Sequence, residues 1–393
     1  MMWKQCETLQ EQLISLRREL HKVPELGSVL PKTQGLICAA LDNWGIPYTP
    51  SPLDSAVLGE IRGGKPGKTL LLRADIDALP VQEETGVDYT STHPGKMHAC
   101  GHDAHAAMLL GAIKVLHDNR DALCGNVKFV FQTAEETVDG ATKAIEAGAL
   151  DNVDAVFGCH IGNLLGPELP AGTFSIAPGC VMASVDSFKI TVHGKGCHGS
   201  APEKGVDPIT IASHIVINLQ EILAREIAAV HPTSLTVGYI KSGDAGNIVP
   251  DTAELGGTLR ALSPSNREFV LRRMEEIANS TATLFRGSCT FETVCGAKTV
   301  ENDAAMAALA ARAAQKVVGA DFVQTSFPSN MGSEDFSEYL ALRPGAFYFL
   351  SSASDEATRV PHHNPRFNID ESVLWKGSAV FVSIAQEFLN KGE

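Results

Sequence analysis

The segment TLLLRADIDALP, residues 69–80, decides the fold. Residues 69–72 form a short apolar run that predicts a strand, and the charged residues Arg73, Asp75 and Asp77 follow it directly. Two later predicted strands, at residues 127–131 and 155–158, are likewise followed directly by polar residues. Apolar residues at helical spacing surround these strands, over residues 7–21, 33–44 and 105–117. Strands that alternate with helices predict an α/β layer built on parallel strands.

The middle of the chain has a different order of elements. Its predicted strands and helices cover residues 188–192, 208–228, 235–240, 253–261, 265–285 and 289–294. Their order, β-α-β-β-α-β, is that of a ferredoxin-like domain. Helices at 304–318 and 371–389, with a strand at 346–350, then resume the first pattern. We therefore predict a discontinuous α/β domain of residues 1–184 and 296–393, with an inserted α+β domain of residues 185–295.

The bulk composition is that of an ordinary soluble globular protein. Of the 393 residues, 44% are hydrophobic and 20% are charged, and the formal net charge is −14. This acidity argues against binding to nucleic acid or to an anionic membrane surface, but it still allows an anionic small substrate. No run of about 18 apolar residues predicts a membrane span. The N-terminus lacks the apolar core of a signal peptide, and the nine scattered cysteines favour a reduced, cytoplasmic protein.

Side chains that can bind metals gather just past the carboxyl ends of the predicted strands, the edge where α/β sheets bind their ligands. They are Asp75, Asp77, Cys100, His102, Asp103, Glu135, Glu136, His160, His362 and His363. Any one of them alone could be a helix cap or a solvated charge, but so many at one edge predict a site.

Thiolate, imidazole and carboxylate are the ligands of Zn²⁺ and its neighbours. Two such ions about 3.5–4 Å apart can share a water molecule and lower its pKa. One carboxylate must then stay off the metals to carry protons. Glu135 and Glu136 suit this division, because neighbours at a strand end point in different directions.

The sequence strongly resembles a family of metallopeptidases, the two-metal aminoacylases and carboxypeptidases. The likeness is to the branch of hippurate hydrolases and plant auxin-conjugate hydrolases, and it runs from about Leu16 to Leu389. The segments that carry it are RADIDALP, HACGHDAH, QTAEE, GCHIG, HGKGCHGSAPEKGVDP, GNIVPD, GTLR, GSEDF and HHNPRFNIDE. One loop departs from the branch: NLLGPELPAG (residues 163–172) replaces a version that commonly contains tryptophan, and we expect the acyl pocket to differ with it.

The resemblance implies roles for individual residues. The implied metal ligands are Cys100, His102, Glu136, His160 and His363. It further implies that Glu135 is the general base and acid, and that two divalent ions are bound, Zn²⁺ or Mn²⁺, with Co²⁺ or Ni²⁺ as alternatives.

For the inserted domain, the resemblance implies dimerisation, giving a homodimer or a dimer-based oligomer. His198 would reach the partner's active site and polarise the scissile carbonyl. Asn247 and Arg260 would grip the substrate carboxylate. From the residues alone, His198 is equally well a surface loop histidine and Arg260 an exposed strand charge.

The expected activity is hydrolysis of N-acyl amino acids to a carboxylic acid and a free amino acid. Two other functions stay open. A dipeptidase, aminopeptidase or carboxypeptidase of the same family is one, and a substrate with a free amine would need an acidic partner such as Asp75 or Glu334. A non-catalytic metal-binding or ligand-binding relative is the other, although it would have no need of Glu135.

Overall fold

The computed structural model describes residues 1–390, which form two compact units. The first unit comprises Met1–Val181, Glu301–Pro328 and the chain from Asp335 onward, and the second comprises Met182–Val300 with Ser329–Glu334. The sequence prediction placed the inserted segment at 185–295 and gave it no part of residues 329–334. The short strands β7 (Gly179–Met182) and β14 (Val300–Asn302) contain the points at which the chain enters and leaves the long segment of the second unit.

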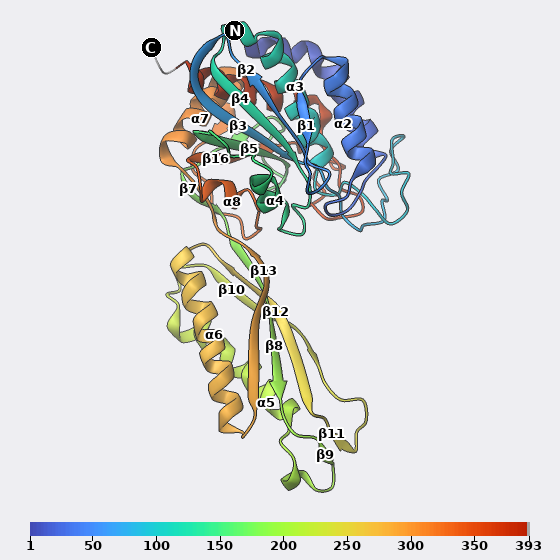
Figure 1. Ribbon diagram of the computed structural model, residues 1–393, viewed down its shortest axis with the longest axis vertical. Helices are drawn as coiled ribbons and strands as arrows, with labels where there is room; N and C mark the ends of the chain where they lie inside the picture. Colours follow the sequence, from blue (N-terminus) through green and yellow to red (C-terminus); the bar gives the residue numbers. More distant parts are fainter. Residues whose placement is uncertain (391–393) are drawn as a thin grey trace. The chain divides into compact units, whose positions relative to one another are not determined.

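The first unit is built on an eight-stranded sheet with the order β1-β2-β4-β3-β5-β16-β6-β15 (Figure 1). Its strands are β1 (Tyr48–Pro50), β2 (Val57–Arg62), β3 (Lys65–Asp75), β4 (Cys124–Gln132), β5 (Ala155–Gly162), β6 (Phe174–Ser175), β15 (Val323–Gln324) and β16 (Gly345–Ser351).

The central strands β4, β3, β5 and β16 are parallel, as predicted. Three further strands, which the sequence analysis did not predict, form antiparallel pairs: β1 with β2, β2 with β4, and β6 with β16, whereas β6 and β15 are parallel. Only Gly63 and Gly64 link β2 to β3, and the two strands run in opposite directions, but β4 lies between them in the sheet and is the strand with which β2 pairs.

Helices pack against this sheet and against one another. They are η1 (Met2–Leu9), α1 (Gln10–His21), α2 (Pro31–Asn43), α3 (His102–Asp118), η2 (Arg120–Ala122), α4 (Gly140–Glu146), α7 (Ala304–Val318), η5 (Ala320–Phe322), α8 (Ser337–Leu340), η6 (Glu371–Val373) and α9 (Leu374–Leu389). The central helix α3 packs on α1, α9 and β3 and is buried along nearly its whole length. Gly111 permits that packing, because a Cβ there would lie 2.6 Å from Ser378 Oγ and 2.8 Å from a methyl group of Leu13. Gly111 thus lets α3 approach α1 and α9 closely.

The second unit has the predicted β-α-β-β-α-β order. Its elements are β8 (Ser184–His193), β9 (Cys197–His198), η3 (Pro202–Lys204), α5 (Pro208–Glu221), the π-helix η4 (Ile222–Glu226), β10 (Thr233–Lys241), β11 (Ile248–Val249), β12 (Thr252–Ala261), α6 (Pro264–Leu284) and β13 (Ser288–Ala297). The four long strands form an antiparallel sheet with the order β10-β12-β8-β13, and α6 lies along it (Figure 1).

Both long helices of the second unit begin as their sequences predict. Asp207 and Ser263 cap α5 and α6 by accepting a hydrogen bond from a backbone N–H in the first turn, and a proline follows each cap. Alternate residues of β8, such as Ile190, then pack beneath the helices in a separate core. Within residues 1–390, no helix is both long enough and apolar enough to cross a bilayer.

Candidate metal centre

The predicted site residues of the first unit converge at one edge of its sheet. The parallel strands β3, β4 and β5 end there at Asp75, Gln132 and Gly162, and α3 begins there at His102. One expectation was wrong: His160 lies inside β5 and not beyond its end. The apolar run stops before His160, but the strand continues because Phe349 and Ser351 of β16 still pair with His160 and Gly162.

Asp77 organises the first part of the site. Its carbonyl oxygen accepts a hydrogen bond from His102 Nδ1 at 3.0 Å, so the Nε2 atom of His102 faces the interior without its proton. Its two carboxylate oxygens accept the backbone N–H groups of Glu135 and Glu136, at 3.1 and 3.2 Å. The preceding residue, Ala134, has a φ of 56°, a left-handed conformation that is strained for alanine and typical of functional turns. Asp77 therefore orients the His102 ring and holds the backbone of Glu135 and Glu136 in place.

The two glutamates are held at nearly equal distances from the same imidazole. His102 Nε2 lies 4.0 Å from Glu135 Oε2 and 3.9 Å from Glu136 Oε1. Both side chains are mostly buried, at 10% and 13% exposure. Ligand atoms about 4 Å apart can both reach one ion that lies ~2 Å from each of them.

Cys100 belongs to two adjacent groups of potential ligands. In one, Cys100, His102 and Glu136 place their ligand atoms within 4.8 Å of one another. In the other, Cys100 does so with His160 and His362. The Nδ1 of His160 donates to the Ile161 carbonyl at 2.8 Å, which leaves Nε2 facing the Cys100 sulfur at 3.5 Å. Cys100 could therefore contribute its sulfur to a metal ion held by either group.

The neighbouring histidines His362 and His363 lie differently. His362 is in the second ligand group, although its Nε2 also accepts the Asn163 backbone N–H at 3.2 Å. Gly162 makes room for the ring of His362, since a Cβ on Gly162 would lie 2.1 Å from its Nε2. His363, the ligand implied by the resemblance, has a φ of 63° and a side chain 55% exposed, with Nε2 3.6 Å from Glu136 Oε1. Both histidines are therefore within reach of the centre, His362 beside Cys100 and His160 and His363 beside Glu136.

A third group, Asp75, His102 and His105, is less suited to a metal. His105 Nδ1 donates to Asp75, and His105 Nε2 accepts the Ile161 backbone N–H at 2.8 Å. Asp75 also pairs with Arg73 at 2.6 Å. Although burial favours the neutral acid, Arg73 and the two histidines hold the pKa of Asp75 well below its usual range. Asp75 and His105 are therefore engaged with protein groups, and only His102 of this group remains available as a ligand.

Asp103 is turned away from the centre. Its carboxylate receives Arg17 Nε at 2.8 Å and His21 Nδ1 at 2.7 Å, all buried. Asp103 therefore ties α1 to the first turn of α3. The sequence analysis counted Asp103 among the metal-capable residues, and it overlooked His105; the spacing of His105, one helical turn after His102, was the available signal.

The donors fit divalent metal ions. His102 Nε2 and Glu136 Oε1 are buried and have no hydrogen-bond partner within residues 1–390, which is rare for buried polar atoms unless an ion or water satisfies them. Burial, with help from Glu136, raises the pKa of the Cys100 thiol, and a divalent cation would reverse that by drawing off the proton. Burial lowers the pKa of His160, which favours the neutral imidazole that metals bind.

The predicted residues of the second unit fall at two separate places. His198 on β9 pairs with Ile248, and the N–H of Gly199 donates to the Asn247 carbonyl at 2.8 Å, so His198 and Asn247 are neighbours. Arg260 lies far along β12, where its Nη1 donates to the Met331 carbonyl at 3.1 Å and to Ser333 Oγ at 3.3 Å.

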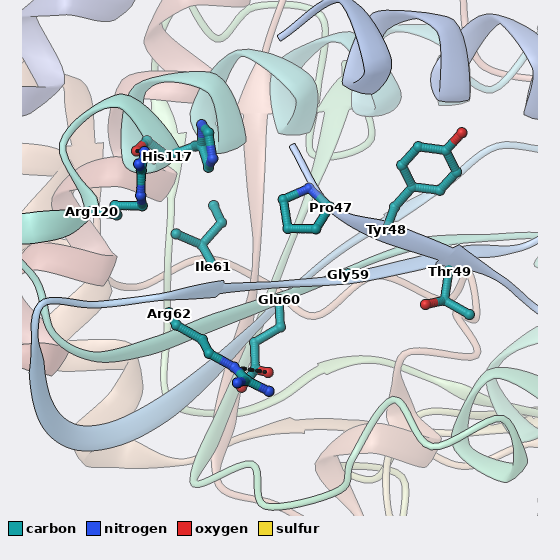
Figure 2. A pocket seen from close by; sticks show the side chains of 9 residues that line it. All are labelled: Pro47, Tyr48, Thr49, Gly59, Glu60, Ile61, Arg62, His117 and Arg120. Atoms are coloured by element: carbon teal, nitrogen blue, oxygen red, sulfur yellow. Dashed lines mark hydrogen bonds and ion pairs between the residues drawn. The ribbon is translucent and has the colours of Figure 1, made fainter. Parts of the chain in front are cut away.

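A cavity of about 480 Å³ lies elsewhere on the first unit, on the outer strands β1 and β2 beside the end of α3 (Figure 2). Arg62 and Glu60 pair with each other at its rim, 3.1 Å apart. It contains none of the potential metal ligands described above, so we assign the chemistry to the centre around Cys100.

Replacing Cys100 with serine is expected to weaken both metal positions, because a hydroxyl is a much poorer ligand than a thiolate. We expect bound metal to fall from about two ions per chain to about one or fewer, measured by elemental analysis of the purified protein. Cys159→Ser is the matched control: Cys159 is also buried, but as the strand neighbour of His160 it points to the opposite face, and this variant should keep its metal. Full occupancy with normal turnover in Cys100→Ser would remove Cys100 from the centre.

Comparison with known proteins places these features in context. Residues 71–387 match the model of peptidase family M20/M25/M40. The chain is 39% identical to an N-acetyl-L-cysteine deacetylase of Bacillus subtilis, covering 98% of this chain and 90% of that protein. It is 38% identical to thermostable carboxypeptidase 1 of Saccharolobus solfataricus, with coverage of 98% and 97%. It is 36% identical to an IAA-amino acid hydrolase of Arabidopsis thaliana, with coverage of 96% and 86%.

Among solved structures, a Bacillus subtilis protein described as a dinuclear metal-binding peptidase of the M20 family superposes with a TM-score of 0.84. It is 33% identical, over 97% of this chain and 98% of that one. The predicted fold class, an α/β unit with an inserted antiparallel sheet domain, is thereby confirmed.

Proposed function

This chain belongs to peptidase family M20/M25/M40, as its motifs predicted, and we propose that it is a metal-dependent amidohydrolase of N-acyl amino acids. Its products would be a carboxylic acid and a free amino acid. The observation that carries the proposal is the pair of ligand groups that share Cys100, with the Glu135 carboxylate 4.0 Å from His102 Nε2. Similar proteins named as a deacetylase and as an amino acid conjugate hydrolase support this substrate class.

The proposed ligands are Cys100, His102, Glu136, His160 and His363, with His362 as a further candidate beside Cys100. Two divalent ions, Zn²⁺ or Mn²⁺ by preference, would polarise the scissile carbonyl and lower the pKa of water between them. Asp77 and the Ile161 carbonyl fix His102 and His160 in the tautomers that bind metals.

Glu135 moves the proton in this proposal. It takes a proton from the attacking water and returns it to the nitrogen of the departing amino acid, so one carboxylate serves as base and then as acid. The hydrogen bond from its own backbone N–H to Asp77 holds it beside the ligands. Glu136, its neighbour, is left to bind the metal.

The second unit is proposed to complete the site from a partner subunit. His198 would stabilise the charge that develops on the carbonyl oxygen, and Asn247 and Arg260 would hold the substrate carboxylate. Arg260 pairs with Val185 and Thr252 pairs with His193, so eight residues of β12 separate Arg260 from the end of the sheet next to His198. At ~3.4 Å per residue that is roughly 27 Å, too far for both side chains of one subunit to touch one small substrate. A homodimer in which each site takes these residues from different subunits resolves the difficulty.

A dipeptidase would need a carboxylate to hold the free amine of its substrate. Asp75, one of the two candidates in the sequence, is fully buried and already paired with Arg73 and His105, so it is a poor choice. A carboxypeptidase is chemically closer, since it also cuts the amide bond of a terminal amino acid, and one of the similar proteins has that name.

A substrate panel tests the proposal. With Mn²⁺ or Zn²⁺ added, at least one compound of a panel of N-acetyl, N-benzoyl, longer N-acyl and indole-acetyl amino acids is expected to be hydrolysed, and dipeptides with a free amine to be cut much more slowly. The same acyl amino acids with an amidated carboxyl group are the control and should be poor substrates. Cleavage of dipeptides or longer peptides alone would make the protein a peptidase, and no cleavage of any compound would favour a non-catalytic binding protein.

A further inference from the structure

A small cavity lies beside His160, between the loop of residues 163–172 and the ends of β5, β6 and β16. It belongs entirely to the first unit. Its walls are mainly Leu164, Leu165, Leu169 and Phe349, with Ser175 and Ser351 at their margins. Because the cavity begins at a proposed metal ligand, a group attached to the scissile carbonyl could extend directly into it.

The chemistry of the walls indicates which half of a substrate the cavity would accept. No charged side chain lines it. The hydroxyl of Ser351 already donates to the Leu169 carbonyl at 2.7 Å, and that of Ser175 donates to Gln324 at 3.4 Å. An amino acid carboxylate placed there would lose its hydration without gaining a lysine or arginine partner, which is costly. An uncharged acyl group would lose nothing, so the cavity suits the acyl half.

The cavity is also small and firmly built. It leaves about 10 Å³ for the centre of a water-sized sphere, about the room that one water molecule or one methyl group needs. The loop that closes it is fastened to β16, where Gly172 N–H donates to the Ser351 carbonyl at 2.8 Å. A turn in which Gly166 N–H donates to the Asn163 carbonyl at 3.0 Å fixes the leucines between them.

We propose that this cavity is the acyl subsite and that it restricts the enzyme to acetyl and similarly short acyl groups, an inference that rests on the proposed function. Leu165 and Leu169 are the lining residues that can be substituted with least effect on the fold, because both are only partly buried and lie in a loop. Phe349, in contrast, is buried in β16. Longer aliphatic acyl groups and benzoyl groups would meet these leucines.

The test compares acyl groups of increasing length on one amino acid, from acetyl through butyryl to hexanoyl. For the wild type, kcat/KM is expected to fall roughly tenfold or more from acetyl to hexanoyl, the scale of overpacking effects in packed interiors. In Leu165→Ala and Leu169→Ala the preference should move toward the longer chains, by about fourfold for each methylene group newly accommodated. Dissociation constants of the same compounds, measured by calorimetry on metal-loaded Glu135→Gln, should follow the same order in the absence of turnover.

Leu342→Ala is the matched control, because Leu342 is an exposed leucine of the same unit at 53% exposure and should leave the acyl preference unchanged. Turnover of acyl amino acids with an unaltered chain-length preference in both leucine variants would overturn the subsite alone. A change in preference for the amino acid and not for the acyl group would assign the cavity to the other half of the substrate and overturn it as well. Failure of the wild type to cleave any acyl amino acid would overturn the proposed function and the subsite together.

Discussion

Glu135→Gln is expected to lower kcat by about 10⁴-fold or more while the bound metal stays unchanged. General acid–base groups typically contribute ~10²–10⁴-fold, and this single carboxylate is proposed to serve both the attack of water and the departure of the amine. Glutamine keeps the size of the side chain and the backbone hydrogen bond to Asp77, so the turn should persist. Steady-state kinetics on N-acetyl amino acids, together with elemental analysis of the same sample, measure both quantities.

The control for this prediction is Glu146→Gln on α4, which makes the same change at an exposed position of the same unit. It should retain full activity. If Glu135→Gln kept more than about a tenth of wild-type activity, Glu135 would not be the proton carrier. If it lost its metal along with its activity, Glu135 would be a ligand, and Glu136 would become the candidate base.

Mixed dimers of two inactive variants are expected to recover about a quarter of wild-type activity. Glu135→Gln lacks the proton carrier in the first unit, and His198→Ala lacks the donated imidazole in the second. When the two variants are unfolded together and refolded, random pairing makes roughly half of the dimers mixed, and each mixed dimer contains one site with both residues. Activity is measured per milligram of refolded protein, and the mixed dimers are counted by mass spectrometry of differently tagged chains.

The control mixes Glu135→Gln with the double variant Glu135→Gln/His198→Ala, which forms the same dimers but no site with an intact Glu135. It should recover nothing. Absence of recovery in the first mixture, with mixed dimers demonstrably present, would mean that His198 acts within its own subunit or has no part in the reaction. A strictly monomeric protein with normal turnover would contradict the shared site outright.

Most of the fold could be predicted because its elements carry strong local signals. The capped helices that begin at Pro208 and Pro264, and the buried strand around residues 69–72, are plain in the sequence. The antiparallel direction of β2 and the last four residues of β5 could not be predicted in this way. Both depend on which strands become neighbours, and that information lies far away in the chain, in β4 and β16.

The residue types of the site could be predicted from the sequence, but the positions of these residues relative to one another could be predicted less well. Cys100, His102, Glu136 and His160 were identified, and the structure brings them to one edge. His362 lies close to these residues because Gly162 has no side chain and leaves room for the His362 ring. The sequence does not show which residues approach each other in this way. The role of Asp77 likewise comes from three separate hydrogen bonds made across the fold.

The first unit is assembled from the beginning and the end of the chain, and this has a consequence for its synthesis on the ribosome. Strand β5 needs β3 on one side and β16 on the other, and α3 needs α9. The long strands of the second unit, in contrast, all lie between Ser184 and Ala297. The second unit can therefore fold on the emerging chain while the first still waits for its missing strand and helix. His362 and His363 are translated after all the long strands of the second unit, so the full set of proposed ligands exists only once the chain of that unit has been synthesised.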